Sequence, residues 1–336
     1  MTRSGSKATF SRQVATAVPN KASARTQLAA TASVLGLRQV NGVLPNNRIG
    51  IAAGRGLIAG IMAAFGPTLP GTFVSRVNSG GVHGEWVRAA GVRHGDKAIY
   101  YIHGSGYVVC SARTHRGLAS RLSKATGLPV FVVDYRLAPE HPFPAAAEDA
   151  AAGYRWLLAH GYRAGNVVIG GDSAGCHLTL DLLLQNRAAG EPQPAGAFMF
   201  SPLLDPTLTL AERRDRILPD PMAPAWVGRR MIEHYTANEP VDSPRLRLQI
   251  PAGAVLPPLF VQASAGEMLA DDAQTLRAMA EAAGTPCELQ LWPGRIHVFQ
   301  ALPLLVPEAA AALRHAAAFV TSTLARANSP IQEQVG

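Results

Sequence analysis

A serine lies between two glycines in the segment Gly171–Gly175, which reads Gly-Asp-Ser-Ala-Gly. The segment follows the apolar run Asn166–Ile169 and precedes an Ala- and Leu-rich stretch of helical length. A serine on a sharp strand-to-helix turn needs very small residues two positions before it and two after it, because the backbone folds back tightly there. Such a turn exposes the hydroxyl at a helix N-terminus, where an oxyanion is favoured. We therefore interpret Ser173 as a catalytic nucleophile.

A serine hydroxyl is a weak nucleophile, so it needs a general base. In α/β-hydrolases the acid and then the histidine follow the serine along the chain. Four histidines follow Ser173, and His297 is the predicted base because it lies in the loop after the last predicted strand. We expect His177 to pack or hydrogen-bond locally, His234 to lie in a cap segment and His315 to face outward from a final Ala-rich helix.

The acid that orients the imidazole should follow the predicted strand Pro258–Ala263. Glu267 is the carboxylate nearest the end of that strand. Asp271 and Asp272 come one turn later and have the position of helix-start carboxylates, which the helix dipole favours. We favour Glu267, and Asp271 stays the alternative. Asp172 is excluded, since a residue beside the nucleophile cannot also reach the far side of the histidine ring.

An oxyanion site is expected in the segment His103-Gly104-Ser105-Gly106-Tyr107, directly after the predicted strand Lys97–Ile102. Glycine-rich backbone lets N–H groups point inward, toward a tetrahedral intermediate. Together with the N–H of Ala174 they would stabilise its negative oxygen, which is commonly the largest single contribution to catalysis.

Three motifs in this order, His103–Tyr107, Asp134–Ala145 and Gly171–Gly175, resemble the hormone-sensitive-lipase family of α/β-hydrolases. The similarity extends from about residue 85 to 324. It implies an esterase of mostly short acyl chains, with a cap built from N-terminal helices and the stretch before the last two strands. It also implies that Tyr135–Ala145 braces the two catalytic loops, and that the oxyanion donors are the N–H groups of Ser105, Gly106 and Ala174.

The sequence departs from that family's usual pattern at three positions. Ser105 replaces a glycine in the oxyanion motif, which restricts the backbone there. Cys176 replaces a glycine after the nucleophile, where a small buried thiol is expected but a modified one would block the site. Glu267-Met268 stands where many members have Asp-Pro, as in a subgroup that uses Glu.

Short apolar runs alternate with helical stretches from Gly71 onward, which predicts a mostly parallel sheet of about eight strands flanked by helices, the α/β-hydrolase fold. The predicted strands are Thr72–Val77, Lys97–Ile102, Pro129–Asp134, Asn166–Ile169, Gly196–Ser201, Pro258–Ala263 and Glu288–Trp292. The predicted helices are Thr114–Ala125, Ala145–Ala159, Ala174–Ala188 and Asp272–Ala283, with a further piece near Trp226–Tyr235.

The domain organisation follows from where this alternation starts and stops. Residues 1–70 are predicted to be a basic leader and cap helices, with doubtful order up to about residue 45. Residues 71–325 form the catalytic domain, with a proline-rich cap insertion at about 202–250, and residues 326–336 are a tail. Apolar cap residues could line an acyl pocket, namely Ile61, Met62, Phe65, Met222, Trp226, Met231 and Tyr235.

The net charge of +8 belongs to the N-terminal segment, which has nine basic residues and no acidic one before Glu85. The rest carries 22 of the 31 basic residues against all 23 acidic ones. This near-neutral core argues against nucleic acid as a partner. The basic segment could contact an anionic membrane surface or be a targeting signal. The apolar stretch Ile49–Phe73, broken by Arg55 and several glycines, is a poor membrane span.

Three cysteines without a C-x-x-C pair indicate a reduced, cytoplasmic location with no disulfide framework or zinc site. No metal is expected, and no cofactor, since Gly54–Gly60 follows no strand and lacks a Walker lysine. The sequence thus predicts a carboxylic ester hydrolase for uncharged, short- to medium-chain small-molecule esters. The alternatives are a lactone or amide hydrolase, a lipid-associated lipase with the same triad, and a non-catalytic small-ligand receptor. A homodimer stays open.

Overall fold

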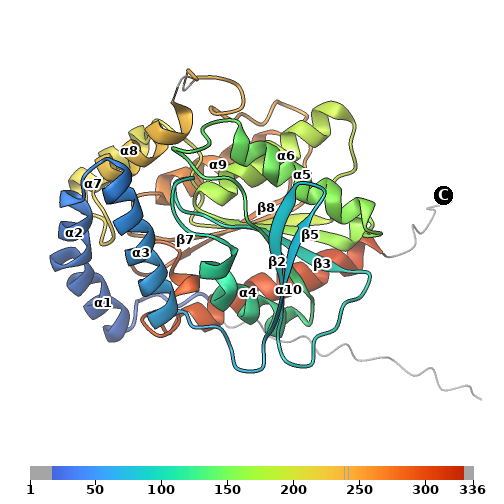
Figure 1. Cartoon of the computed structure of the whole chain (residues 1–336), viewed down its shortest axis with the longest axis horizontal. Helices are drawn as coiled ribbons and strands as arrows, with labels where there is room; N and C mark the ends of the chain where they lie inside the picture. The colour runs from blue at the N-terminus through green and yellow to red at the C-terminus, as the bar shows by residue number, and fades with distance from the viewer. Residues whose placement is uncertain (1–16, 238, 241, 329–336) are drawn as a thin grey trace, which may run out of the picture.

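The computed structural model describes residues 17–237, 239–240 and 242–328. These residues form an eight-stranded sheet in the order β1-β2-β4-β3-β5-β6-β7-β8, with β1, β2 and β4 paired antiparallel and the other pairs parallel (Figure 1). The strands are β1 (Phe73–Ser79), β2 (Val82–Arg88), β3 (Ala98–Ile102), β4 (Val130–Val133), β5 (Val167–Asp172), β6 (Gly196–Phe200), β7 (Leu259–Ser264) and β8 (Cys287–Trp292). The predicted fold class is confirmed.

The strand β2 was not among the predicted strands, whereas the other seven lie within a few residues of their predicted positions. β2 pairs with β1 in a hairpin whose two turn residues, Gly80 and Gly81, have φ values of 61° and 77°. Two positive φ angles suit the tight turn that matches the twist of a hairpin, and Gly-Gly is a signal for it. The hairpin could therefore have been found from the sequence.

Helices cover both faces of the sheet. The helices α4 (Ala112–Thr126) and α10 (Ala309–Ala327) lie on one face, and α5 (Ala145–Ala159), α6 (Ala174–Ala189) and α9 (Ala270–Ala282) lie on the other (Figure 1). Successive residues of β3 belong to opposite cores: Tyr100 packs with α5, whereas Ile99 and Tyr101 pack toward α4. A strand covered on both sides is apolar throughout, and all five residues of β3 are buried.

Five further helices gather at one end of the sheet, on the left of Figure 1. They are α1 (Ala24–Leu35), α2 (Leu37–Val43), α3 (Arg48–Phe65), α7 (Thr209–Ile217) and α8 (Ala225–Thr236), and we call them the cap. The two cap regions expected from the sequence thus lie together, with α8 where a helical piece was predicted. Residues 1–16 of the predicted leader and 329–336 of the predicted tail lie outside the described residues.

The expectation that order is doubtful up to about residue 45 is wrong for the described residues 17–45, because α1 and α2 form there. Their order comes from distant parts of the chain. The Thr26 hydroxyl donates to Glu308 at 2.6 Å, and Arg38 forms a two-pronged ion pair with Asp215 at 2.8 and 3.0 Å. Weak local periodicity cannot reveal such tertiary contacts.

The helix α3 is, by length and composition, long and apolar enough to cross a membrane, with a mean hydropathy of 1.4, and it is the one such helix in the described part of the chain. The sequence had indicated a poor span at this stretch because of Arg55. That residue donates to the carbonyl oxygens of Val108 and Ala138 and pairs with Glu140 at 2.8 Å. These contacts join α3 to the loop that follows β3 and to the loop that follows β4.

Candidate active site

The turn at Ser173 connects β5 to α6. Ser173 has φ 49° and ψ −121°, a conformation that non-glycine residues rarely adopt, and it is held by hydrogen bonds from its N–H to Phe200 O and from Leu203 N to its carbonyl. A Cβ atom on Gly175 would lie 2.1 Å from the Ile102 carbonyl oxygen. The strained turn therefore needs glycine there, as the motif indicated.

The loop after β3 follows an equally unusual path. Ser105, Gly106 and Tyr107 have φ values of 120°, 58° and 65°. Ser105 thus takes a conformation that glycine would adopt more easily, and its hydroxyl donates to the Val109 carbonyl oxygen. Within the described residues, no group accepts a hydrogen bond from the backbone N–H of Ser105, Gly106 or Ala174. These three donors are available to a bound oxygen.

His297 and Glu267 meet at the C-terminal edge of the sheet, in the loops after β8 and β7. His297 Nδ1 donates to Glu267 Oε2 at 2.8 Å, and Ser264 N donates to Glu267 Oε1 at 3.0 Å. Glu267 is fully buried. Burial by itself lowers the pKa of His297, but the hydrogen bond to Glu267 and its negative charge raise it above the ordinary value of histidine. The pair is therefore built to hold a proton on the imidazole.

We call residues 265–269, the loop between β7 and α9, the acid loop. The two carboxylates that follow it, in the first turn of α9, have different partners. Asp271 pairs with Arg214 at 2.7 Å. Asp272 accepts hydrogen bonds from the backbone N–H groups of Leu204 and Asp205, and burial raises its pKa to about 7. Neither carboxylate makes a hydrogen bond with His297, since Glu267 occupies its Nδ1.

The remaining histidines past Ser173 have structural partners. His177 Nε2 donates to the Leu246 carbonyl oxygen at 2.7 Å, so its partner is distant in sequence and not local as expected. His234 Nε2 lies 2.7 Å from Asn46 Oδ1, between α8 and the loop before α3. The expectation that His315 faces outward is wrong, because it is buried and hydrogen-bonds Gln290. Alanine-rich helices hide which face is covered.

Two further expectations concern residues beside these loops. Cys176 is buried, and its thiol donates to the Phe200 carbonyl oxygen at 3.5 Å, while burial raises its pKa. Tyr135 OH donates to the His103 carbonyl oxygen at 2.8 Å, and Ala138 N donates to Tyr107 O at 3.0 Å. The segment Tyr135–Ala145 thus contacts the oxyanion loop.

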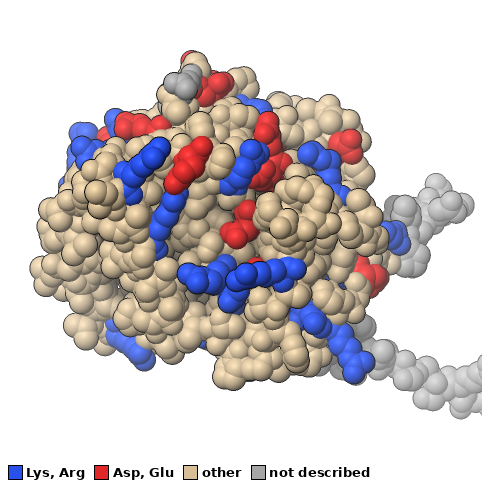
Figure 2. All heavy atoms as spheres, viewed as in Figure 1, with Lys and Arg blue, Asp and Glu red and all other residues tan. Residues whose placement is uncertain are grey.

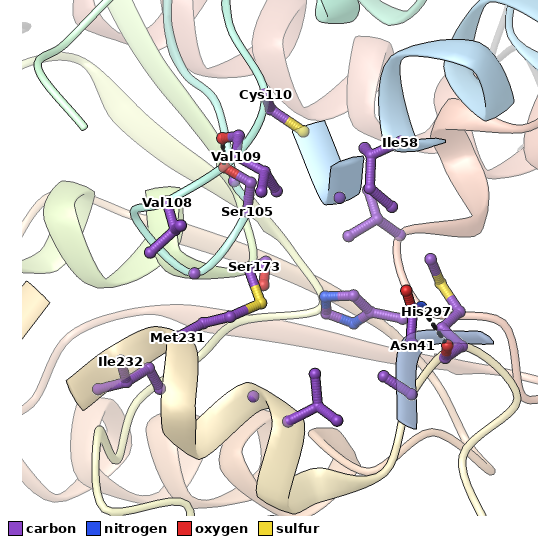
Figure 3. Close-up of a pocket in the computed structure, with 18 of the residues that line it drawn as sticks. Asn41, Ile58, Ser105, Val108, Val109, Cys110, Ser173, Met231, Ile232 and His297 are labelled. Carbon is purple, nitrogen blue, oxygen red and sulfur yellow. Dashed lines mark hydrogen bonds between the residues drawn. The ribbon is translucent and has the colours of Figure 1, made fainter. Parts of the chain in front are cut away.

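A pocket of about 260 Å³ opens above Ser173 and His297, between the sheet edge and the cap. Figure 3 shows the imidazole and the hydroxyl facing the same space, with Met231 beside Ser173 and Ile58 across the pocket.

Five of the seven apolar residues expected at an acyl pocket line it: Ile61, Met62, Met222, Trp226 and Met231. The other two pack elsewhere. Tyr235 stacks on Tyr107 with ring centroids 3.9 Å apart, and Phe65 packs against the core.

Comparison with known proteins matches this architecture. A family model described as the alpha/beta hydrolase fold matches residues 99–301. An acetyl-hydrolase of Streptomyces hygroscopicus is 40% identical over 239 residues, covering 70% of this chain and 78% of that protein. Esterase LipU of Mycobacterium tuberculosis is 36% identical over 243 residues, covering 70% and 82%. The crystal structure of an esterase from the bacterial hormone-sensitive lipase family superposes with a TM-score of 0.80 at 33% identity, covering 88% and 98%.

The chain belongs to the hormone-sensitive-lipase family of α/β-hydrolases. This membership makes it a hydrolase of the esterase and lipase class. The resemblance inferred from three short motifs is thereby confirmed.

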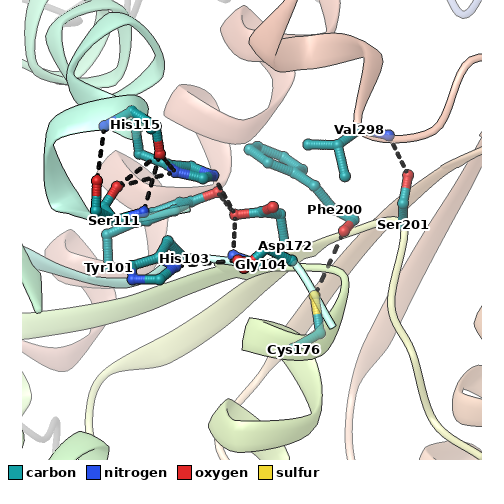
Figure 4. A network of polar contacts seen from close by, with 12 residues as sticks. Tyr101, His103, Gly104, Ser111, His115, Asp172, Cys176, Phe200, Ser201 and Val298 are labelled. Carbon is teal, nitrogen blue, oxygen red and sulfur yellow. Dashed lines mark hydrogen bonds and ion pairs between the residues drawn. The ribbon is translucent and has the colours of Figure 1, made fainter. Parts of the chain in front are cut away.

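A buried polar network that the sequence did not reveal lies behind the oxyanion loop of this hydrolase (Figure 4). Asp172 Oδ1 accepts hydrogen bonds from Tyr101 OH at 2.8 Å and Gly104 N at 3.0 Å, and lies 3.3 Å from His115 Nε2. Burial alone would raise the pKa of Asp172, but His115 and Tyr101 bring it below the ordinary value. Asp172 therefore ties the nucleophile turn to the oxyanion loop as a carboxylate.

Two adjacent tyrosines of β3 test this network by the same substitution. Tyr101→Phe removes a donor to the Asp172 carboxylate, and Tyr100→Phe removes one to the Ala150 carbonyl oxygen at 2.7 Å. Urea unfolding should show both variants less stable, by about 1.5–3 kcal/mol for Tyr101→Phe and about 0.5–1.5 kcal/mol for Tyr100→Phe. Only Tyr101→Phe should lower kcat/KM for an ester. Equal kcat/KM values for the two variants would contradict a role for the network in catalysis.

Proposed function

We propose that this hydrolase cleaves uncharged carboxylic esters of short to medium acyl chain through a Ser173-His297-Glu267 triad. The observation that carries the proposal is the 2.8 Å hydrogen bond between His297 and the buried Glu267, at the edge of the pocket that also exposes Ser173. A histidine with its far nitrogen held by a carboxylate presents the other nitrogen as a base. The cap covers this pocket as a lid on a catalytic domain of residues 71–325, with the insertion at about 202–250.

The reaction proceeds by two acyl transfers. His297 takes the proton of Ser173 as the oxygen attacks the ester carbonyl, and it returns that proton to the leaving alcohol. An acyl-enzyme remains. His297 then deprotonates a water molecule, which releases the acid and restores the serine. Glu267 stabilises the imidazolium during both steps.

The negative oxygen of each tetrahedral intermediate is bound by the N–H groups of Ser105, Gly106 and Ala174. Two observations support this assignment. None of the three N–H groups has a hydrogen-bond acceptor within the described residues, and all three lie near Ser173, at the ends of β3 and β5. Gly104 in the same motif approaches Asp172 so closely that a Cβ atom would lie 2.3 Å from Asp172 Oδ2. This close approach fixes the donors before substrate arrives, as preorganised catalysis requires.

The substrate class follows from the pocket. Its volume of about 260 Å³ lies just below the usual range of ligand sites, which is about 300 to 1,000 Å³. The charged residues in its wall are Arg230, whose guanidinium lies 4.9 Å from the Trp226 ring, and Asp172, which has buried partners. Arg230 is exposed and Asp172 is occupied by its own donors, so neither is a buried, unpaired charge facing the pocket. Relatives named acetyl-hydrolase and a related esterase structure, EstE5, soaked with p-nitrophenyl butyrate fit small uncharged esters.

The triad is tested by three single substitutions assayed with p-nitrophenyl butyrate. Ser173→Ala and His297→Ala should each lower kcat by about 10⁴-fold or more, because the residues of a triad act as a unit. Glu267→Gln should cost less. Asp271→Asn is the matched control, since it changes a nearby carboxylate in the first turn of α9 that pairs with Arg214. A larger loss for Asp271→Asn than for Glu267→Gln would show that the acid is wrongly assigned.

The acyl preference is tested with p-nitrophenyl esters of two to sixteen acyl carbons. We expect kcat/KM to be highest between about two and eight carbons, because longer chains exceed the pocket volume. Lactones and anilides assayed in parallel should be turned over more slowly. An optimum at the long end, or faster turnover of lactones or anilides, would overturn this substrate class.

A second candidate role, contact with an anionic lipid surface, is favoured by the exposed face of α1–α3. Figure 2 shows few charged side chains over these helices, on the left of the view. After Arg48 at its start, the exposed residues of α3 are all apolar or glycine: Ile49, Ala52, Ala53, Gly56, Gly60, Ala63 and Ala64. On α1 and α2, Leu28, Leu35 and Val43 are each at least 70% exposed.

The positive charge of these helices favours anionic lipid as the partner of this face. The exposed charged residues of residues 17–65 include Lys21, Arg25 and Arg48, and no acidic residue occurs before Glu85. A symmetric dimer through this face would bring like charges together, whereas anionic headgroups attract each basic residue by about 1 kcal/mol. We propose peripheral contact of this kind; the homodimer and the cytoplasmic location expected from the sequence stay predictions.

The lipid contact is tested by co-sedimentation with vesicles. The full chain should bind phosphatidylglycerol vesicles more than pure phosphatidylcholine vesicles, and salt should weaken binding. Val43→Asp should reduce binding several-fold. Val255→Asp is the matched control. Val255 is 51% exposed, and it lies beside Gly284 of the turn between α9 and β8, outside the helices α1–α3. Equal binding of both variants, or none to either vesicle, would remove the proposal.

A further inference from the structure

The loop that contains Glu267 is held from the cap as well as from the sheet. From the sheet side, Ala265 N donates to Trp292 O at 2.7 Å and Gly266 N donates to Gly294 O at 2.8 Å. These two bonds fix the start of the loop only. The groups that follow, the Glu267 carbonyl and the Met268 N–H, are bound by side chains of the segment 214–220.

Arg214 of α7 forms hydrogen bonds with one side of this loop. Its Nε donates to Glu267 O at 2.8 Å, one terminal nitrogen pairs with Asp271 at 2.7 Å, and the other donates to Ala265 O. A guanidinium offers several donors in a rigid plane, so two carbonyls of the loop and Asp271 in the first turn of α9 are fixed together.

Asp220 binds the other side of the loop that contains Glu267, and it is fully buried. Its Oδ2 accepts from Met268 N at 3.0 Å and its Oδ1 from Met222 N at 2.9 Å. The preceding residue, Pro219, accepts a hydrogen bond from Arg295, two positions before His297. One short stretch of the cap insertion therefore touches both the acid loop and the histidine loop.

The N-terminal helices hold this stretch in turn. Arg38 of α2 pairs with Asp215, whose Oδ1 accepts from Asp220 N at 2.7 Å, and Arg38 also donates to Asp220 O at 2.8 Å. Asn41 Nδ2 donates to Met222 O at 2.8 Å. A continuous chain of hydrogen bonds thus runs from α2 through Asp220 to the residue beside Glu267.

Asp220 also contributes charge. Burial raises its pKa to about 6, while nearby His297 lowers it and Glu267 raises it. The carboxylates that raise the pKa of His297 are Glu267, Asp220 and Asp172. Asp220 is thus a second anion that favours the imidazolium, although no hydrogen bond joins it to the ring within the described residues.

We propose that Asp220, seated by the Arg38–Asp215 pair, is a positioning residue that sets Glu267 against His297, so that the triad is complete only when the N-terminal helices are docked. This inference rests on the proposed role of Glu267. Substrate binding and triad geometry then depend on one element, the cap, which both covers the pocket and holds the acid loop.

The test uses the full-length enzyme and its pH profile. Asp220→Ala should lower kcat about 10- to 100-fold, the loss expected for a small displacement of catalytic groups, with KM changed less than about twofold. Asp220→Asn keeps one acceptor and should lose less. Both remove the negative charge, so the acid limb of kcat/KM, where His297 must lose its proton, should move to lower pH.

Two arginine variants extend the test to the N-terminal helices. Arg38→Met should lower kcat, as Asp220→Ala should. Arg38→Lys should lower kcat less, because lysine keeps the positive charge but cannot form the two-pronged pair with Asp215. Arg277→Met is the control, since Arg277 pairs with Glu281 on the exposed surface of α9. It should leave kcat and the acid limb unchanged.

The inference falls if the Asp220 variants keep wild-type kcat and an unshifted acid limb while Glu267→Gln loses activity. It also falls if Asp220→Ala changes only KM or the melting temperature, because that result marks a merely structural residue. A Glu267→Gln variant with full activity would instead overturn the acid assignment of the proposed function.

Discussion

The site depends on one close contact, between the nucleophile turn and the oxyanion loop. The two backbones pass each other with no room for a side chain, because a Cβ atom on Gly175 would meet Ile102 O and one on Gly104 would meet Asp172. Parallel β3 and β5 are direct neighbours in the sheet, so their C-terminal ends bring these loops together. The strained φ of Ser173 and of Ser105 is held by this packing.

Buried carboxylates form the second level of organisation. Asp172 and Glu267 each receive several donors, which offsets the unfavourable desolvation of a buried negative charge. Asp220 and Asp272 receive backbone N–H groups only, and burial raises their pKa values to about 6 and about 7. The buried carboxylates in and around the site thus differ in the donors that surround them.

The cap helices contact the candidate active site directly. Arg55 of α3 binds Val108 O, in the loop that carries the proposed oxyanion donors, and Tyr235 of α8 stacks on Tyr107 of the same loop. Met231 lies so close to Gly106 that a Cβ atom there would approach its methyl carbon to 3.1 Å. Arg214 and Asp220 act in the same way on the acid loop. Cap helices therefore contact the loop after β3 and the loop after β7 as well as the pocket.

The sequence by itself determined the sheet, its covering helices and the order of the candidate residues Ser173, Glu267 and His297. These features leave local marks: apolar runs of strand length, glycines flanking a serine, and a carboxylate or histidine directly after a strand. Even the missed strand β2 had such a mark in Gly80-Gly81.

Only the tertiary structure decided the order of α1 and α2, the burial of His315 and the partners of Asp172 and Asp220. These depend on contacts between segments far apart in the chain, such as Arg38 with Asp215 and Asp220 with Met268. Asp220 lies between two prolines, where no sequence periodicity indicates whether a residue is buried. Its environment arises from folding, because desolvation and donor geometry are properties of the packed chain and not of the residue.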